Sequence, residues 1–157
     1  MTRTHLNSFC LIVLSCFLFT GCGVNKHSPA ANNNPDAVAA KNSQPIGEKL
    51  KENNHLPVEE RIALYHRLKK ENPDGYNFES RDELNMYGYS LLWSNLPKEA
   101  LAIFKLNVEQ FPDWFEGYDS LGEGYMNNGD NEKAIANYER SLQMNPGNFN
   151  AEDQIER

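Results

Sequence analysis

The sequence predicts an all-α protein that repeats a helix–turn–helix unit every 34 residues. The first observation is that small residues, aromatic residues and prolines recur at this offset, in the pairs Gly88 and Gly122, Ala100 and Ala134, Phe104 and Tyr138, and Pro112 and Pro146. The second is that turn-forming residues stand midway through each unit, at Asn95-Leu96-Pro97 and Gly129-Asp130. A fixed period of this length is typical of stacked helical hairpins, in which each unit buries its apolar face against the next.

The repeat region divides into four predicted helices, at about 81–94, 97–110, 114–127 and 131–144. Ser80 and Glu83 have the spacing of a capping box, in which each side chain bonds the other's backbone N–H. Pro97 suits the first position of a helix. Gly129 tolerates the positive φ that a tight turn between helices requires.

The pattern within each repeat resembles the tetratricopeptide repeat (TPR). The second repeat has Tyr118-x-x-Leu121-Gly122-x-x-Tyr125, Ala134-x-x-x-Tyr138 and Pro146, and the first has Leu84-x-x-Tyr87-Gly88-x-x-Leu91, Ala100-x-x-x-Phe104 and Pro112. The resemblance implies a TPR-like α-solenoid of two helix–turn–helix repeats, at 81–114 and 115–148, plus an N-terminal flanking helix. Small residues let two helices approach and aromatic rings fill the remaining gap. The predicted packing residues are Gly88, Ala100, Phe104, Tyr118, Leu121, Gly122, Tyr125, Ala134, Tyr138 and Pro146.

Residues 48–80 are interpreted as the flanking helix and a connector. Apolar residues recur there at helical spacing and predict a helix over about 57–71, namely Val58, Ile62, Tyr65 and Leu68. Arg61 stands where a further repeat would need a small residue, so this helix only resembles part of a repeat.

Residues 149–157 form either a tail or a partial capping helix, too short to be stable without docking. About three repeats are usually needed for a stable array. The flanking helix would supply the missing layer, or self-association would do so.

The two repeats also resemble the TPR tail of bacterial serine hydrolases of the penicillin-binding or α/β-hydrolase type. The resemblance rests on Asp82-Glu83-Leu84-Asn85-x-x-Gly88-Tyr89-x-Leu91-Leu92, on Phe104-Lys105-Leu106-Asn107-Val108-Glu109-x-Phe111-Pro112 and on Tyr118-Asp119-Ser120-Leu121-Gly122-Glu123. The sequence contains neither the Ser-x-x-Lys nor the Gly-x-Ser-x-Gly motif of the hydrolases themselves. The resemblance implies, as an alternative function, an accessory or regulatory subunit of an envelope serine hydrolase.

The N-terminus predicts an export signal followed by a lipid anchor. Arg3 precedes an apolar run, Phe9 to Phe19, which is too short to span a bilayer as a helix and is typical of a signal peptide. The run ends in Phe19-Thr20-Gly21-Cys22, which resembles the bacterial lipobox. This implies a lipoprotein signal peptide over 1–21 and acylation of Cys22 by diacylglycerol with palmitate-type chains. The alternatives are an ordinary signal peptide with a chance cysteine, or a buried hydrophobic element.

Residues 22–47 are poor in large apolar side chains and predict a flexible tether, because such a segment cannot bury enough surface to offset its ordering entropy. The alternative is a loop packed on the domain. Gly23 stands where an aspartate would signal inner-membrane retention in Gram-negative lipoproteins. By that resemblance we expect a lipid-anchored protein of the cell envelope, at the outer membrane and facing the periplasm.

Composition excludes several classes of function. The formal net charge is −7, which repels a phosphate backbone, so nucleic acid is not an expected partner. Cys10, Cys16 and Cys22 all lie in the first 22 residues, and no pair of histidines has metal-ligand spacing, so we expect no metal and no cofactor. Acidic pairs such as Glu59-Glu60 favour helix N-termini over catalysis. We therefore expect no catalytic residues and no enzyme.

TPR arrays bind protein segments in a groove lined by the first helix of each repeat. By resemblance, the groove positions are Asn85, Tyr89, Leu92, Trp93, Asp119, Glu123, Met126 and Asn127. They include no Lys or Arg, so the carboxylate clamp of chaperone-binding TPR domains is absent. We expect a protein or peptide segment that is neutral or basic and partly apolar. Trp93 and Trp114 are further candidates for partner contact. The predicted function is a membrane-anchored module of protein–protein interaction.

Overall fold

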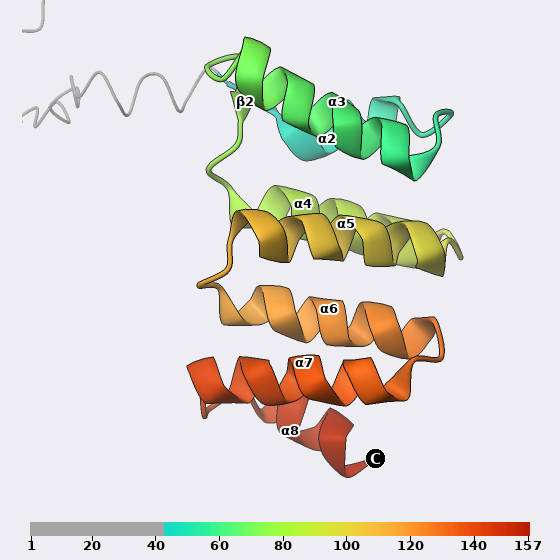
Figure 1. Cartoon of the computed structure of the whole chain (residues 1–157), viewed down its shortest axis with the longest axis vertical. Helices are drawn as coiled ribbons and strands as arrows, with labels where there is room; N and C mark the ends of the chain where they lie inside the picture. Colours follow the sequence, from blue (N-terminus) through green and yellow to red (C-terminus); the bar gives the residue numbers. More distant parts are fainter. Residues whose placement is uncertain (1–42) are drawn as a thin grey trace, which may run out of the picture. The chain divides into compact units, whose positions relative to one another are not determined.

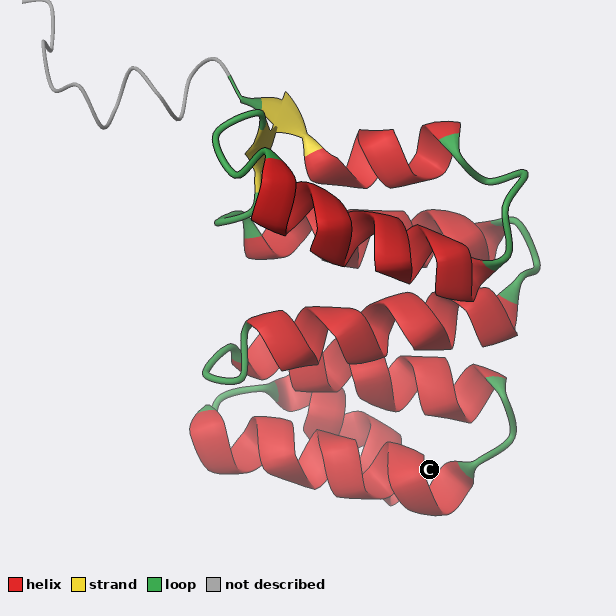
Figure 2. Cartoon of the chain, turned by 45° about the horizontal axis from the view of Figure 1, so that its top comes forward, coloured by secondary structure: helices red, strands yellow, loops and turns green. Residues whose placement is uncertain are grey.

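The computed structural model describes residues 43–157 as seven helices and a two-stranded parallel sheet (Figures 1 and 2). The strands are β1 (Gln44–Pro45) and β2 (Tyr76–Asn77), with Gln44 opposite Tyr76 and Pro45 opposite Asn77. The helices are α2 (Ile46–Glu52), α3 (Val58–Glu71), α4 (Arg81–Trp93), α5 (Pro97–Gln110), α6 (Phe115–Asn127), α7 (Asn131–Met144) and α8 (Phe149–Glu156). The fold is an all-α, TPR-like solenoid, as predicted.

The helices form three successive hairpins, α2–α3, α4–α5 and α6–α7, followed by α8 (Figure 1). The first helices of neighbouring hairpins contact one another, α2 with α4 and α4 with α6. We call the surface made by these three helices the first-helix face. The second helices, α3 and α5, also contact each other. The first-helix face therefore belongs to three hairpins, not to two.

Each repeat is closed by an aromatic ring against a glycine. A Cβ atom on Gly88 of α4 would overlap the ring of Phe104 on α5, and a Cβ on Gly122 of α6 would lie 2.8 Å from Cδ1 of Tyr138 on α7. Both rings are fully buried. The remaining predicted packing residues are buried at Ala100, Leu121 and Ala134, partly buried at Tyr118 and Tyr125, and exposed at Pro146. Close approach of the paired helices thus depends on the missing side chain at each glycine.

The turns between paired helices use the left-handed backbone region at the same repeat position. Asn95 has φ 60° before α5 and Gly129 has φ 78° before α7, 34 residues later. Glycine and asparagine are the residues that adopt this region most readily. Pro97 occupies the start of α5, and Oδ1 of Asp130 accepts a 3.3 Å hydrogen bond from the Lys133 N–H at the start of α7.

Helix α2 was not predicted, and it moves the start of the folded domain. The predicted tether extended to residue 47, but Ile46, Gly47 and Leu50 are buried. The helix has seven residues and too few apolar positions for a periodicity to be recognised. A helix this short is stable only when docked. It packs on α4 and α3, so the docking surface and not the local sequence decides that it forms.

Arg61 on α3 is buried, and it joins the N-terminal hairpin to the first repeat. Its guanidinium donates hydrogen bonds to the Tyr87 hydroxyl, to Glu99, with which it forms an ion pair, and to Oδ1 of Asn54 at 3.0 Å. Burial disfavours its charge, but the bonds to Glu99 and Tyr87 outweigh that effect and raise the pKa of Arg61. A paired arginine therefore fills the position where a repeat has a small residue.

The capping box predicted at the start of α4 does not form. The Ser80 side chain makes no cap hydrogen bond. Oε2 of Glu83 instead accepts a 3.1 Å hydrogen bond from the Gly47 N–H at the start of α2. The prediction was wrong because a tertiary partner competes for Glu83, and spacing along the sequence cannot reveal that partner.

Residues 149–156 form a docked helix, α8. Its Asn148 cap accepts from the Ala151 N–H, and Ala151 is fully buried in a small core with Ala134 and Tyr138. Of the two alternatives for this segment, the structure contains the capping helix. The docking that such a short helix requires comes from α7 and from side-chain bonds to α6.

The predicted signal peptide, Cys22 and the tether up to residue 42 lie outside the described residues. Within residues 43–157, no helix has the length and apolar character needed to cross a bilayer.

Candidate functional site

The predicted groove positions differ in how far they are available at the first-helix face. On α4, Asn85, Tyr89 and Leu92 are partly buried, whereas 76% of Trp93 is exposed. On α6, Asp119 and Glu123 are partly buried. Met126 and Asn127 are exposed. The most accessible predicted residues therefore stand at the C-terminal ends of both helices.

The centre of the predicted groove is closed by bonds within the chain. The Tyr89 hydroxyl donates a 2.9 Å hydrogen bond to Oε2 of Glu123 and lies 3.2 Å from the Ser120 hydroxyl. Burial raises the pKa of Tyr89 far above its ordinary value, and the negative charge of Glu123 adds to the effect. Tyr89 remains a neutral donor throughout the physiological range, and Glu123 is engaged before any partner arrives.

Asp119 is engaged as well. Its two carboxylate oxygens accept from the side-chain amides of Asn148, at 3.1 Å, and Asn150, at 2.8 Å. The carboxylate thus ties α6 to the start of α8. The sequence placed Asp119 among the groove residues, and only the position of α8 reveals that it has partners in the chain.

An exposed apolar pair lies on α4, next to the bonded centre. Trp93 stacks on Tyr89 with ring centroids 6.1 Å apart and an interplanar angle of 29°. Met86, seven residues earlier, is 60% exposed. Seven residues are two helical turns, so both side chains lie on the same side of α4. Met86 is not among the predicted groove residues.

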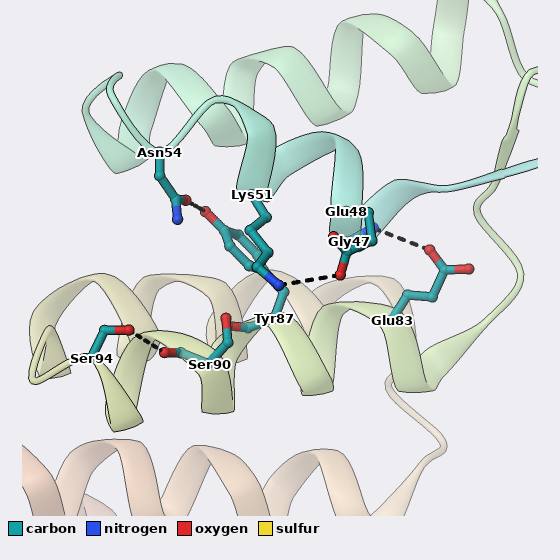
Figure 3. Close-up of polar contacts among 8 residues, drawn as sticks. All are labelled: Gly47, Glu48, Lys51, Asn54, Glu83, Tyr87, Ser90 and Ser94. Carbon is teal, nitrogen blue, oxygen red and sulfur yellow. Dashed lines mark hydrogen bonds and ion pairs between the residues drawn. The ribbon is translucent and has the colours of Figure 1, made fainter.

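A pocket of about 320 Å³ lies between α2 and α4, beside this pair. The α2 wall contains Gly47, Glu48 and Lys51, with Pro45 at its edge. The α4 wall contains Asp82, Glu83, Met86, Tyr87, Ser90 and Trp93. Figure 3 shows several of these side chains between the two helices. We call this cavity the α2–α4 pocket.

Three polar contacts lie in or next to the walls of the pocket, and one of them joins α2 directly to α4. The Glu83 carboxylate accepts from the Gly47 N–H and thereby fixes α2 on α4, while Nζ of Lys51 lies 3.5 Å from Oε1 of Glu48 across one turn of α2 (Figure 3). Deeper, the Tyr87 hydroxyl donates a 2.6 Å hydrogen bond to Oδ1 of Asn54. Asp82 is exposed, and within residues 43–157 its side chain forms no hydrogen bond or ion pair.

The sequence analysis missed the pocket because one of its walls belongs to α2, a helix that was not predicted. Trp93 is the one predicted groove residue that lines it. Met86 could have been found from its place on the same helical face as Trp93 and Tyr89. No pattern in the local sequence indicates that Glu48 and Lys51 lie next to α4.

Trp114, the other tryptophan named as a candidate for partner contact, has little exposed surface. It is 9% exposed at the start of α6, under the guanidinium of Arg81 at 6.0 Å from the ring centroid, and it lies close to Gly117. Within residues 43–157, no three His, Cys, Asp or Glu side chains are grouped so as to hold a metal ion.

Comparison with known proteins agrees with this architecture. Residues 115–148, which are α6, α7 and their flanks, match the tetratricopeptide repeat family model. A 50-residue part of the chain is 42% identical to the Hsp70-Hsp90 organizing protein of Triticum aestivum. The match covers 32% of this chain and only 9% of the wheat protein. The chain thus carries a tetratricopeptide repeat, which is a module of protein–protein interaction.

Proposed function

We propose that this chain is a lipid-anchored interaction module that binds a segment of a protein partner on its first-helix face. The observation that carries the proposal is the exposure of Trp93 beside Met86, on a helix whose other large apolar residues are buried or partly buried. Exposed aromatic and methionine side chains next to a cavity are typical of binding surfaces. Trp93 would be the central contact.

The partner is a neutral or basic, partly apolar segment of protein. The groove positions on α4 and α6 carry no cation that could bind a carboxylate terminus, and the chain has a net charge of −7. The wheat relative is named for organising Hsp70 and Hsp90. Because so little of that protein is matched, only the general role of bringing proteins together is carried over to this chain.

The anchor is the acyl group on Cys22, after cleavage of the signal peptide. Each buried CH₂ of an acyl chain contributes about 0.8 kcal/mol to membrane binding, so a lipidated Cys22 would hold the module at the envelope. We place it at the outer membrane, facing the periplasm. The module itself catalyses nothing in this proposal and acts by holding its partner near the membrane.

Site-specific photocrosslinking tests the binding face. A photoreactive residue replaces Asn127 on the first-helix face or, as the control, exposed Glu139 on α7. We expect a discrete crosslinked adduct from position 127 and none from position 139. Equal adducts from both positions, or no adduct from position 127 in intact cells, would refute the proposed face.

Fractionation tests the anchor independently. We expect the intact chain in the membrane fraction and a Cys22→Ser variant in the soluble periplasmic fraction. If both versions distribute alike, the lipid anchor is absent. This outcome leaves the binding proposal standing, because crosslinking at position 127 does not depend on the anchor.

A further inference from the structure

We infer that the α2–α4 pocket receives a large apolar side chain of the partner, next to a lysine or arginine that binds Asp82. This inference rests on the proposed function and specifies its partner. It assigns to the N-terminal hairpin, through α2, a direct part in recognition.

The apolar half of the pocket suits one large side chain. Met86 and Trp93 stand two turns apart on α4, about 10 Å along the helix axis, and the cavity between α4 and α2 measures about 320 Å³. This lies at the small end of the range for pockets that enclose a ligand group. The stacking of Trp93 on Tyr89 holds one edge in place before binding, which reduces the entropy lost on association.

The polar half of the pocket favours a cation. Its wall carries three acids, Glu48, Asp82 and Glu83, against the single cation Lys51. Glu83 already accepts from the Gly47 N–H, and Glu48 pairs with Lys51. Asp82 is left exposed in the first turn of α4, one helical turn from Met86, and its carboxylate has no side-chain partner within residues 43–157. A lysine or arginine adjacent to the inserted side chain would satisfy it.

The same charges argue against two other occupants. An acidic segment would bring like charges to Asp82 and Glu48. A second copy of this chain would bring a net charge of −7 to a pocket that is itself acidic. A basic, apolar protein segment is the occupant that matches both halves of the site.

Three synthetic probes test the inference. Fluorescein-labelled peptides in Gly-Ser flanks carry Lys-Phe-Lys, Glu-Phe-Glu or Lys-Ala-Lys at their centre, and anisotropy follows their binding to the full chain in detergent. We expect Lys-Phe-Lys to bind at least about tenfold more tightly than either of the others, since it alone fills the apolar space and supplies the cation.

Paired variants locate the binding to the pocket. Trp93→Ala should weaken Lys-Phe-Lys by about tenfold or more, whereas Phe149→Ala, which removes an equally exposed aromatic on α8, should change it less than about twofold. Asp82→Lys should remove the preference for Lys-Phe-Lys over Glu-Phe-Glu. The control Glu132→Lys changes an exposed acid in the first turn of α7 and should preserve that preference.

Several outcomes would overturn the inference. These are tightest binding of Glu-Phe-Glu, no binding of Lys-Phe-Lys up to about 1 mM, or equal losses in the pocket variants and their controls. Light scattering that showed a dimer dissociated by Trp93→Ala would assign the pocket to a second copy. Crosslinking from position 127 tests the first-helix face independently of these peptides. The proposed binding face can therefore be supported even if the pocket assignment is refuted.

Discussion

Tyr89 on α4 donates a 2.9 Å hydrogen bond to Oε2 of Glu123 on α6, and the two residues occupy the same position in successive 34-residue repeats. Corresponding positions of the first-helix face are therefore bonded to each other. The bond fixes the distance between the two first helices and removes both residues from the set that faces a partner directly.

Replacing Tyr89 tests how much this bond contributes. Tyr89→Phe keeps the ring against Phe104 and its stack on Trp93 but removes the donor to Glu123. We expect a loss of about 1 kcal/mol in the free energy of unfolding, measured by urea denaturation. Tyr118→Phe is the control, because the Tyr118 hydroxyl forms no hydrogen bond within residues 43–157. Equal stability of both variants would show that the bond adds nothing.

The contact between Gly88 and Phe104 predicts a large effect from one methyl group. Gly88→Ala favours the helix locally by about 1 kcal/mol, but the new Cβ overlaps a fully buried ring. Overpacking costs about 1–3 kcal/mol, so we expect a net decrease in Tm. Adding Phe104→Leu should recover part of the loss. A Gly88→Ala protein more stable than the wild type would contradict the close packing.

Leu50 tests whether α2 belongs to the folded domain. The side chain is fully buried, so Leu50→Ala should cost about 2–4 kcal/mol in chemical denaturation. Lys51→Ala, at the exposed neighbouring position, should stay within about 0.5 kcal/mol of the wild type. If Leu50→Ala also left stability unchanged, residues 46–52 would be part of the tether after all.

Tyr65 predicts a loss of stability in alkali. Burial raises its pKa to about 12, and the charges of Glu79 and Glu109 add to the shift. The unfolded state releases this proton near pH 10, so the stabilisation is complete below pH 10 and is lost as pH rises through about 12. Tyr65→Phe should raise the pH midpoint of alkaline unfolding, followed by circular dichroism.

The same variant should be harmless at pH 7. The buried Tyr65 hydroxyl has no hydrogen-bond partner in the described part of the chain, so removing it leaves no group unsatisfied. The edge-to-face contact with Phe78, at 5.3 Å between centroids, is retained. A large loss of stability at pH 7, or an unchanged alkaline midpoint, would show that the hydroxyl is solvated or bonded in solution.

Asp119 predicts a local effect at the C-terminal end. Asp119→Ala removes the carboxylate that accepts from Asn148 and Asn150 and leaves Asn148 its 2.8 Å bond to the Ser141 hydroxyl, so α8 should open more often while the rest of the fold is kept. Hydrogen exchange of the amides in residues 151–156 should accelerate by about fivefold to tenfold. Asp113→Ala, at an exposed loop position, should leave their exchange unchanged. Exchange that rose equally in all helices would indicate global destabilisation instead.

The fold could be predicted to within a residue or so at most helix ends. The repeat offset places Gly88 opposite Phe104 and Gly122 opposite Tyr138, and the bounds of α4 to α7 follow from the turn residues between them. This works because each repeat is a local unit whose helices contact their sequence neighbours.

The candidate site was predicted less completely, for a physical reason. Trp93, Met126 and Asn127 were predicted at the first-helix face and are exposed. Glu123 and Asp119 were predicted there too, but their carboxylates are bound by residues that a pattern of positions does not reveal. Predicting a residue's place on a helix is thus easier than predicting whether its polar atoms are available.

The sequence by itself determined the α4–α5 and α6–α7 hairpins, because their period, turns and small-residue positions are properties of neighbouring residues. It also determined the net charge and the absence of cations at the groove positions. The tertiary structure alone decided that α2 forms, that Arg61 is neutralised by Glu99, and that a pocket lies between α2 and α4. Each of these depends on contacts between residues distant in the chain. Those contacts form, and stabilise the fold, only when the hairpins stack on one another.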